Sequence, residues 1–378
     1  MLRIFVTGDN HVGMKYSGHE QAAVLAKARI DAFEGMVRTA NLERCGLFVI
    51  TGDLFDTATN SVSKKEIREL LSVLADFEGT VAVLPGNHDY YDESSPAQVW
   101  RYFRDEMAAY SNVMWLNAFR PYDLQVNGEA VRLYPAFCET KHSNPNQNNL
   151  GWMRGLEMER GVYHVGVAHG SVEGESPDEK GTYFPMKRAE LAEIPVDAWL
   201  IGHTHVPFPR NLTAEYTTVS DNVFNAGTHV QTDVSCNTEG LCFVVEIDEN
   251  KTVRAKKAVT GNLRFFRKDI AVSANDFEAI LDRELADLAD NSVVDLILSG
   301  AVTMDEYDRR HQILEAALDR FVEGTYNCYE LSKLITADVV TAEFAETSFS
   351  AGLLTALLDE PKEAQMVYEL LKSLKEGK

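Results

Sequence analysis

Apolar and polar positions follow two alternating patterns in the first quarter of the chain. Short apolar runs near residues 2–7, 47–51 and 80–85 predict buried strands. Between them, apolar positions recur at helical spacing over residues 20–41 and 63–77, which predicts two amphipathic helices. Because parallel strands need crossover connections, which helices usually supply, this order favours a mainly parallel sheet with helices packed on it.

The pattern changes after about residue 202. Short β-rich pieces lie at residues 223–226, 241–247 and 252–259, and the last of them carries charges at alternating positions. Such alternation is typical of strands with one solvated face. These pieces predict a second, more antiparallel sheet that closes the first domain.

From about residue 263 the pattern is again mixed. A helix over residues 275–289, a strand over 293–298 and a helix over 305–321 predict a smaller α/β cap domain. Leucines on both sides of Pro361 predict two short amphipathic helices near the end of the chain. Since single cores rarely exceed about 250 to 300 residues, we predict three parts. They are a main domain (1–262), a cap domain (263–335) and a C-terminal helical segment (336–378).

The composition excludes several classes of protein. No apolar run approaches the roughly 18 residues that span a bilayer, and the first residues lead directly into a strand, so we expect a cytoplasmic protein without membrane contact. The five cysteines are scattered, which favours free thiols over a disulfide framework. The sequence contains no Gly-rich phosphate loop, nucleophile elbow or Rossmann fingerprint.

The charge bears on the nature of the substrate. The net charge is −22, and residues 263–378 hold 12 basic and 23 acidic side chains, which is half of that charge in less than a third of the chain. A protein that binds nucleic acid alone usually has a basic face. A polyanionic substrate would therefore have to be held by metals, by local basic patches or by a partner.

Five short polar blocks directly follow predicted strands, and each contains residue types that bind metals. They are Gly8-Asp9-Asn10-His11, Gly52-Asp53, Gly86-Asn87-His88-Asp89, Ala168-His169-Gly170 and Gly202-His203-Thr204-His205. Open α/β sheets bind ligands at the carboxyl ends of their strands. We therefore expect the five blocks to lie together.

The residue types predict two metal sites that share one carboxylate. Asp9 and His11, two residues apart in extended backbone, can face the same ion, and the lone carboxylate of Asp53 suits a bridge. The first predicted set is Asp9, His11, Asp53 and His205, and the second is Asp53, Asn87, His169 and His203. Oxygen and imidazole ligands without thiolate favour manganese, with iron or zinc as alternatives. Two such ions would activate water and clamp a phosphoryl group, so the pattern indicates a two-metal phosphoester hydrolase.

His88 is not needed in either ligand set. An imidazole ionises near neutral pH, so we expect His88 to stabilise the transition state at phosphorus or to protonate the departing oxygen. Asp89 could orient the His88 ring through a hydrogen bond. The alternative for Asp89 is a structural carboxylate in a turn.

The order of these blocks resembles that of the calcineurin-like metallophosphoesterases over about the first 230 residues. Asp9-Asn10-His11-Val12-Gly13, Gly52-Asp53-Leu54-Phe55-Asp56 and Gly86-Asn87-His88-Asp89 further resemble the SbcD/Mre group of DNA double-strand-break repair exonucleases. The segment Phe224-Asn225-Ala226-Gly227-Thr228 is similar to the strand and turn that this group carries before its cap. The resemblance implies an α/β (α+β) fold, a two-sheet sandwich flanked by helices with a smaller α/β cap.

The resemblance also implies a substrate and partners. It maps the family's seven ligands onto the two predicted sets and its catalytic histidine onto His88, while Asp56 stands where some members carry a histidine. It implies DNA as the substrate, an SbcC-like coiled-coil ATPase that docks on the C-terminal helices, and a two-fold homodimer. The basic residues that we select as candidates for contact with DNA phosphates are Lys15, Lys64, Lys65, Lys141, Arg254, Lys256 and Arg267.

We therefore predict a two-metal-dependent DNA phosphodiesterase of DNA repair, an exonuclease with endonuclease activity left open. One alternative keeps the metals but takes a small phosphodiester, a nucleotide or a phosphoprotein, which the negative charge would favour. An alternative of another class is a non-catalytic scaffold of the same fold. Its usual signature is the loss of ligands or of the histidine at position 88, and this sequence retains both.

Overall fold

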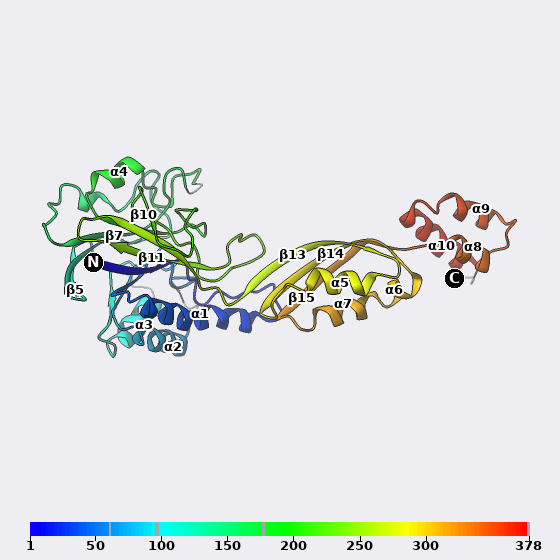
Figure 1. Cartoon of the computed structure of the whole chain (residues 1–378), viewed down its shortest axis with the longest axis horizontal. Coiled ribbons are helices and arrows are strands. Elements are labelled where there is room, and N and C mark those ends of the chain that lie inside the picture. Colours follow the sequence, from blue (N-terminus) through cyan, green and yellow to red (C-terminus); the bar gives the residue numbers. More distant parts are fainter. Residues whose placement is uncertain (60–61, 95–97, 176–177, 376–378) are drawn as a thin grey trace. The chain divides into compact units, whose positions relative to one another are not determined.

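The computed structural model describes residues 1–59, 62–94, 98–175 and 178–375 (Figure 1). The chain divides into two compact units, Met1–Leu263 and Arg264–Lys378. The predicted division into three parts stays a prediction. Within the described ranges, no helix is both long and apolar enough to cross a membrane.

The first unit contains a seven-stranded sheet in the order β4-β3-β2-β1-β11-β12-β9. Its strands are β1 (Leu2–Thr7), β2 (Leu47–Ile50), β3 (Thr80–Val83), β4 (Val113–Trp115), β9 (Thr217–Thr218), β11 (Leu241–Ile247) and β12 (Val253–Val259). Strands β1 to β4 are parallel, as expected, whereas β11 pairs antiparallel with β1 and β12 antiparallel with β11. The prediction that residues 241–247 and 252–259 enter a second sheet is wrong. They extend the first sheet, because β1 would otherwise present an unpaired edge.

The second sheet has five strands in the order β10-β8-β7-β6-β5. They are β5 (Tyr122–Val126), β6 (Glu129–Ala136), β7 (Tyr163–His169), β8 (Ala198–Gly202) and β10 (Val223–Phe224). Only β5 and β6 pair antiparallel, through a hairpin whose turn residues Asn127 and Gly128 both have positive φ. The other pairs are parallel, so the expectation of a more antiparallel second sheet is also wrong.

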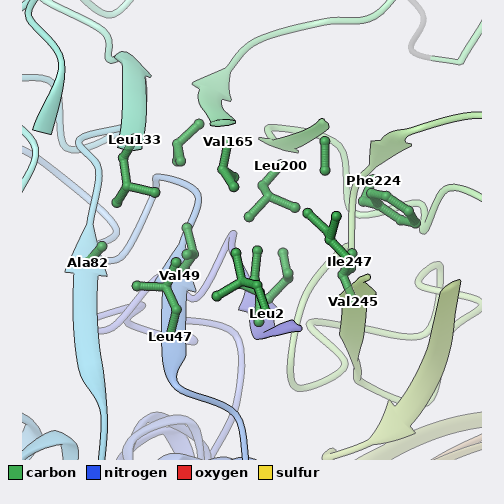
Figure 2. Close-up of a cluster of buried hydrophobic side chains, with 14 of the residues drawn as sticks. Leu2, Leu47, Val49, Ala82, Leu133, Val165, Leu200, Phe224, Val245 and Ile247 are labelled. Carbon is green, nitrogen blue, oxygen red and sulfur yellow. The ribbon is translucent and has the colours of Figure 1, made fainter. Parts of the chain in front are cut away.

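Apolar layers between and outside the two sheets hold the described part of the first unit together. Side chains from both sheets interdigitate between them, with Leu47 and Val49 of the first sheet facing Val165 and Leu200 of the second (Figure 2). Helices α1 (Ala22–Leu42), α2 (Lys64–Ala75) and α3 (Gln98–Met107) cover the outer face of the first sheet, and α4 (Arg188–Glu193) and the short helix η1 (Gly151–Met153) pack on the second. The predicted two-sheet sandwich flanked by helices is confirmed.

The second unit is built on a parallel three-stranded sheet. Its elements are β13 (Arg264–Ser273), α5 (Phe277–Leu285), β14 (Ser292–Val302), α6 (Met304–Asp308), α7 (Arg310–Leu318) and β15 (Glu323–Lys333). The single helix predicted over residues 305–321 is two helices. Thr303 and Glu306 form a capping box that starts α6, and α7 begins anew at Arg310.

Three helices complete the described part of the second unit. They are α8 (Ala337–Glu343), α9 (Phe349–Ala356) and α10 (Pro361–Lys375), and they share a small core with Leu354 and Tyr368 at its centre. The two helices expected around Pro361 correspond to α9 and α10. Helix α8 lies within the predicted C-terminal helical segment (336–378) but was not predicted as a separate helix, although Thr336 caps its first turn.

Candidate metal centre

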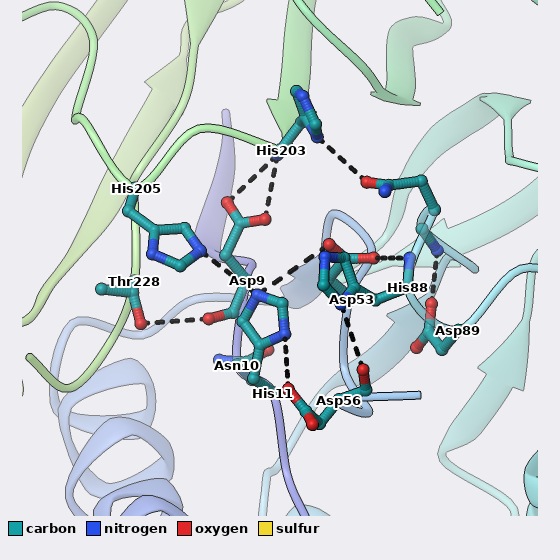
Figure 3. A network of polar contacts seen from close by, with 12 residues as sticks. Asp9, Asn10, His11, Asp53, Asp56, His88, Asp89, His203, His205 and Thr228 are labelled. Carbon is teal, nitrogen blue, oxygen red and sulfur yellow. Dashed lines mark hydrogen bonds and ion pairs between the residues drawn. The ribbon is translucent and has the colours of Figure 1, made fainter. Parts of the chain in front are cut away.

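The strands of both sheets end at the same place. β1, β2 and β3 of the first sheet lead into the blocks around positions 9, 53 and 87, and β7 and β8 of the second sheet lead into those around 169 and 203. All seven predicted ligands come together there in one connected network, which Figure 3 shows for the residues that it labels. The convergence expected from the strand ends is therefore present, but it is made by two facing sheets.

One group of donor atoms lies around His11. Its Nε2 atom is 3.2 Å from Nε2 of His205 and 3.9 Å from Oδ2 of Asp53. The donor atoms of Asp9, His11 and His205 all lie within 4.8 Å of one another. The Asp9 carboxylate also accepts the backbone N–H of His203 at 3.0 and 3.1 Å, which ties the loop after β1 to the loop after β8.

A second group of donor atoms lies around Asn87. Its Oδ1 atom is 2.9 Å from Nε2 of His169 and 3.0 Å from Nδ1 of His203. Oδ2 of Asp53 is 3.3 Å from Nε2 of His169, so this oxygen faces both groups. Asp53 therefore lies where a shared carboxylate would have to lie, and its bridging role stays a prediction.

The donor chemistry fits divalent cations. Two imidazole nitrogens, those of His11 and His205, face each other across 3.2 Å, a separation that one shared cation suits well. Burial, and then the neighbouring charge of His11, lower the pKa of His205 to about 3, while burial and the charge of His169 lower the pKa of His203 to about 4. Both rings are therefore neutral, which is the form that binds a metal.

Asp53 and His169 form a buried ion pair. Burial alone would raise the pKa of Asp53, but the charge and hydrogen bond of His169 hold it below its ordinary value. Burial alone would lower the pKa of His169, but the charge and hydrogen bond of Asp53 raise it. A metal ligand must be a neutral imidazole, so a bound cation would take over the role of the His169 proton.

The backbone of the centre is strained in a way that serves the ligands. Asp9, His11 and Asp53 have φ values of 48°, 45° and 50°, in the left-handed region that L residues rarely adopt. Glycine is required beside them. A Cβ atom on Gly52 would lie 2.3 Å from Nδ1 of His169, and one on Gly86 would lie 2.2 Å from Oδ1 of Asp53. The glycines that precede the polar residues therefore permit the close approach of the loops.

His88 lies beside both donor groups. Its backbone N–H donates to Oδ1 of Asp53 at 2.7 Å, and its ring packs edge-on against His11 with centroids 4.8 Å apart. Its Nδ1 atom is 3.1 Å from the carbonyl oxygen of Asp56. A carbonyl can only accept, so Nδ1 carries the proton in this hydrogen bond and Nε2 is left for other partners.

Asp89 does not orient the His88 ring, so that expectation is wrong. Its carboxylate is fully buried and accepts the backbone N–H groups of Phe55 at 3.0 Å and Gly86 at 2.6 Å. Burial, and then the charge of Asp53, raise the pKa of Asp89 to about 7. Asp89 thus takes the structural role, because it fastens the loop after β3 to the loop after β2.

Two residues of the centre were missed by sequence reasoning. Oδ1 of Asp56 is 3.5 Å from Nδ1 of His11, so this carboxylate can hold the ring of a ligand, and its carbonyl oxygen holds His88. The aromatic ring of Tyr183 lies against that of His203 with centroids 4.9 Å apart. The proximity of Asp56 to the Gly-Asp block was an available signal, whereas nothing in the sequence around Tyr183 points to the centre.

The seven basic residues proposed to contact DNA differ in their exposure and in whether they already contact other side chains. Three of them form ion pairs, namely Arg254 with Glu246, Lys256 with Glu43, and Arg267 with Asp295. Lys64 lies over the ring of Tyr102, and Lys65 is exposed next to it on α2. Lys15 and Lys141 are exposed on segments that adjoin the centre, since Lys15 follows the loop of Asp9 and His11 and Lys141 precedes His142, whose ring contacts Tyr183.

Comparison with known proteins identifies the family of this chain. The profile of the calcineurin-like phosphoesterase family matches residues 2–207, which is more than half of the chain. Similar solved structures include TT1561 of Thermus thermophilus (12% identity, 68% of this chain and 99% of that chain, TM-score 0.41). Another is a dimetal phosphatase from Danio rerio (10% identity, 68% and 98%, TM-score 0.37). No curated protein matched. The family match, over the part of the chain that carries the metal centre, shows that this protein belongs to the calcineurin-like phosphoesterases, a family of metal-dependent hydrolases.

Proposed function

We propose that the protein is a two-metal-dependent DNA phosphodiesterase, an exonuclease with endonuclease activity left open, that acts in DNA repair. The observation that carries the hydrolytic part is the convergence of two carboxylates, one amide oxygen and four imidazoles around Asp53. The DNA part is supported by the likeness of the first three polar blocks, and of the segment 224–228, to the SbcD/Mre group. It is also supported by a second α/β unit that follows the catalytic one.

The residues have distinct tasks in this proposal. Asp9, His11, Asp53 and His205 would hold one ion, and Asp53, Asn87, His169 and His203 the other. When bound, two divalent ions supply Lewis acidity that lowers the pKa of an attacking water and offsets charge on the phosphoryl oxygens. The ligand chemistry suits manganese best, with iron and zinc as alternatives.

His88 completes the proposed chemistry. Its Nδ1 proton is engaged by the Asp56 carbonyl, so the ring is held in one orientation while Nε2 remains available to the substrate. When Nε2 also carries a proton, the imidazolium can stabilise charge on a phosphoryl oxygen or give that proton to the departing sugar oxygen, which leaves the ring neutral with its Nδ1 proton in place. Asp56 and His11 fix the ring from two sides, which limits the motion that would otherwise weaken this interaction.

The acidic surface favours a second candidate. With a net charge of −22, electrostatics oppose the approach of a long polyanion, whereas a small phosphodiester, a nucleotide or a phosphoprotein loop meets less repulsion. Exposed Lys15 and Lys141, on segments that adjoin the centre, offer local attraction for DNA phosphates in the first proposal. The two candidates therefore differ in substrate but share the metal centre.

One assay separates these candidates. Purified protein with Mn²⁺ would be given end-labelled double-stranded DNA, end-labelled single-stranded DNA and bis-p-nitrophenyl phosphate in parallel reactions. We expect degradation of DNA, and we expect the Lys15→Ala/Lys141→Ala variant to lose DNA cleavage while keeping the rate on the small ester. Intact DNA together with hydrolysis of the small ester would favour the second candidate. Inactivity on all three substrates would contradict both and favour the scaffold.

The C-terminal helices are proposed to bind the coiled-coil ATPase partner. On α10, Met366, Leu370 and Leu374 recur at four-residue spacing and are 72%, 58% and 66% exposed, and Phe349 on α9 is 82% exposed. Such a stripe matches the apolar face that one helix presents to another. An SbcC-like coiled coil offers a complementary seam.

Leu370→Asp is therefore expected to weaken binding of the cognate ATPase subunit by more than about tenfold, in line with the loss of one buried interface anchor. Binding would be measured by isothermal titration calorimetry, with Leu370→Met as the matched control that keeps an apolar side chain. The melting temperature and the rate on bis-p-nitrophenyl phosphate should stay unchanged, because Leu370 faces solvent. Equal affinities for the two variants would contradict the proposed docking site.

A further inference from the structure

Arg29 is a fully buried cation behind the metal centre. It lies on the inner face of α1, between Leu25 and Phe33, and its relative exposure is 0%. Arginine is almost never fully buried unless its charge is paired. The contacts of this guanidinium therefore need an explanation that apolar packing of α1 does not provide.

The guanidinium of Arg29 donates to five neutral oxygens. They are the carbonyl oxygens of Asn10 (2.8 Å), Val230 (3.2 Å) and Asp9 (3.3 Å) and the hydroxyl oxygens of Thr228 (3.0 Å) and Tyr16 (3.3 Å). The acceptors come from two segments far apart in sequence, the loop after β1 and residues 228–230. Arg29 thus joins the loop that carries two proposed metal ligands to a distant part of the chain.

Thr228 makes the same connection from the other side. Its hydroxyl lies 3.0 Å from the carbonyl oxygen of Asp9 (Figure 3). It also accepts from Arg29 and lies 3.0 Å from the carbonyl oxygen of Val230, so it can donate to either carbonyl. A β-bridge pairs Thr228 with Gly8. These contacts give a physical role to the segment 224–228, which the sequence singled out without assigning it a task.

We propose that Arg29, together with Thr228, is a positioning residue for the ion held by Asp9, His11 and His205. Asp9 and His11 have left-handed backbone conformations, which cost free energy and persist only where surrounding contacts hold them. The hydrogen bonds from Arg29 to the carbonyls of Asp9 and Asn10 supply that restraint next to both ligands. The inference rests on the proposed two-metal centre and does not depend on which phosphoester is the substrate.

The direction in which loss of Arg29 changes the metal affinity distinguishes a positioning role from a purely electrostatic one. A guanidinium near a cation site repels the cation, so loss of the charge alone would tighten metal binding. If Arg29 acts by holding the ligand loop, its loss weakens binding instead. Lysine at position 29 keeps the charge but has no planar fork, so it cannot serve carbonyls of both segments in the same way.

The test is Mn²⁺ binding followed by isothermal titration calorimetry, with the number of bound ions checked by elemental analysis. Wild-type protein should bind two ions. Arg29→Met should weaken one of them by about 10- to 100-fold, the loss typical of outer contacts of a metal ligand, and leave the other unchanged. The affinity of Arg29→Lys for that ion should lie between those of the wild type and Arg29→Met. Ile30→Val, which removes a buried methylene from the same helix, is the control for stability and should bind like wild type.

A milder pair of variants keeps the inference testable if Arg29→Met does not fold. Thr228→Val removes the hydroxyl but keeps the shape of the side chain, and Thr228→Ser keeps the hydroxyl. We expect valine to weaken the same ion and serine to restore its affinity. Unchanged or tighter binding in Arg29→Met and Thr228→Val, or equal weakening of both ions, would overturn the inference alone. Wild-type protein that binds fewer than two ions would overturn the metal centre and the inference with it.

Discussion

His88→Ala is expected to lose most of the hydrolytic activity while both metal ions stay bound. The ring of His88 belongs to neither proposed ligand set, and its Nδ1 atom is occupied by the Asp56 carbonyl, so Nε2 is the atom left to act on the substrate. Removal of a positioned acid or base typically lowers kcat by about 10²- to 10⁴-fold. The measurement is kcat on bis-p-nitrophenyl phosphate and on DNA, together with the number of ions per chain from anomalous scattering.

His88→Gln tests whether proton transfer is the lost function, and His311→Ala is the control. Glutamine keeps a polar side chain of similar length but cannot transfer a proton, so it should be nearly as inactive as alanine. His311, an exposed imidazole of the second unit that contacts the hydroxyl of Tyr326, is the control and should retain wild-type rates when replaced. An emptied metal site in His88→Ala, or wild-type turnover by it, would remove His88 from the catalytic role.

Asp53→Asn is expected to weaken both ions together. Oδ1 of Asp53 accepts the His88 backbone N–H, and an amide side chain would keep its oxygen there. Its NH₂ group would then replace Oδ2, the oxygen that faces His11 on one side and His169 on the other. Both sites lose a shared negative charge and gain a donor that cannot bind a cation. The affinity of each ion should fall by more than the roughly 10- to 100-fold that loss of an outer contact costs.

Asp56→Asn is the matched control for this substitution. Asp56 is also a carboxylate of the loop after β2, but it lies near His11 and belongs to neither proposed ligand set. Calorimetry with Mn²⁺ should therefore show a change confined to one ion in Asp56→Asn and a change in both in Asp53→Asn. Release of a single ion from Asp53→Asn would show that Asp53 is not the bridge.

The outcome for Asp89 shows where inference from neighbouring residues fails. Asp89 follows His88 directly, and adjacency suggested a hydrogen bond between the two side chains. In the structure the two side chains turn to different partners, so the Asp89 carboxylate accepts N–H groups of Phe55 and Gly86 and the His88 ring meets the Asp56 carbonyl. The direction of each side chain depends on loops that are not adjacent in sequence.

The sheet to which β11 and β12 belong could not be predicted from the sequence either. Alternating charges marked residues 252–259 as a strand with one solvated face, which β12 is. That pattern says nothing about which strand is its neighbour. β11 and β12 belong to the first sheet because β1 has a free edge on which β11 can pair. Ile4 pairs with Val245 although 241 positions separate them in sequence, so this pairing depends on the tertiary structure.

The sequence by itself determined the strands β1, β2, β3, β7 and β8, and with them the seven candidate ligands and the family. Those features are local, because each apolar run predicts a strand and the candidate ligands come directly after that run in the sequence. Only the tertiary structure decided the sheet that β11 joins, the partners of Asp89, and the roles of Asp56, Arg29 and Thr228. Each of these depends on contacts between segments distant in sequence. The role of the buried Arg29 can be inferred only from its hydrogen bonds to both Asp9 and Thr228, which the fold brings side by side.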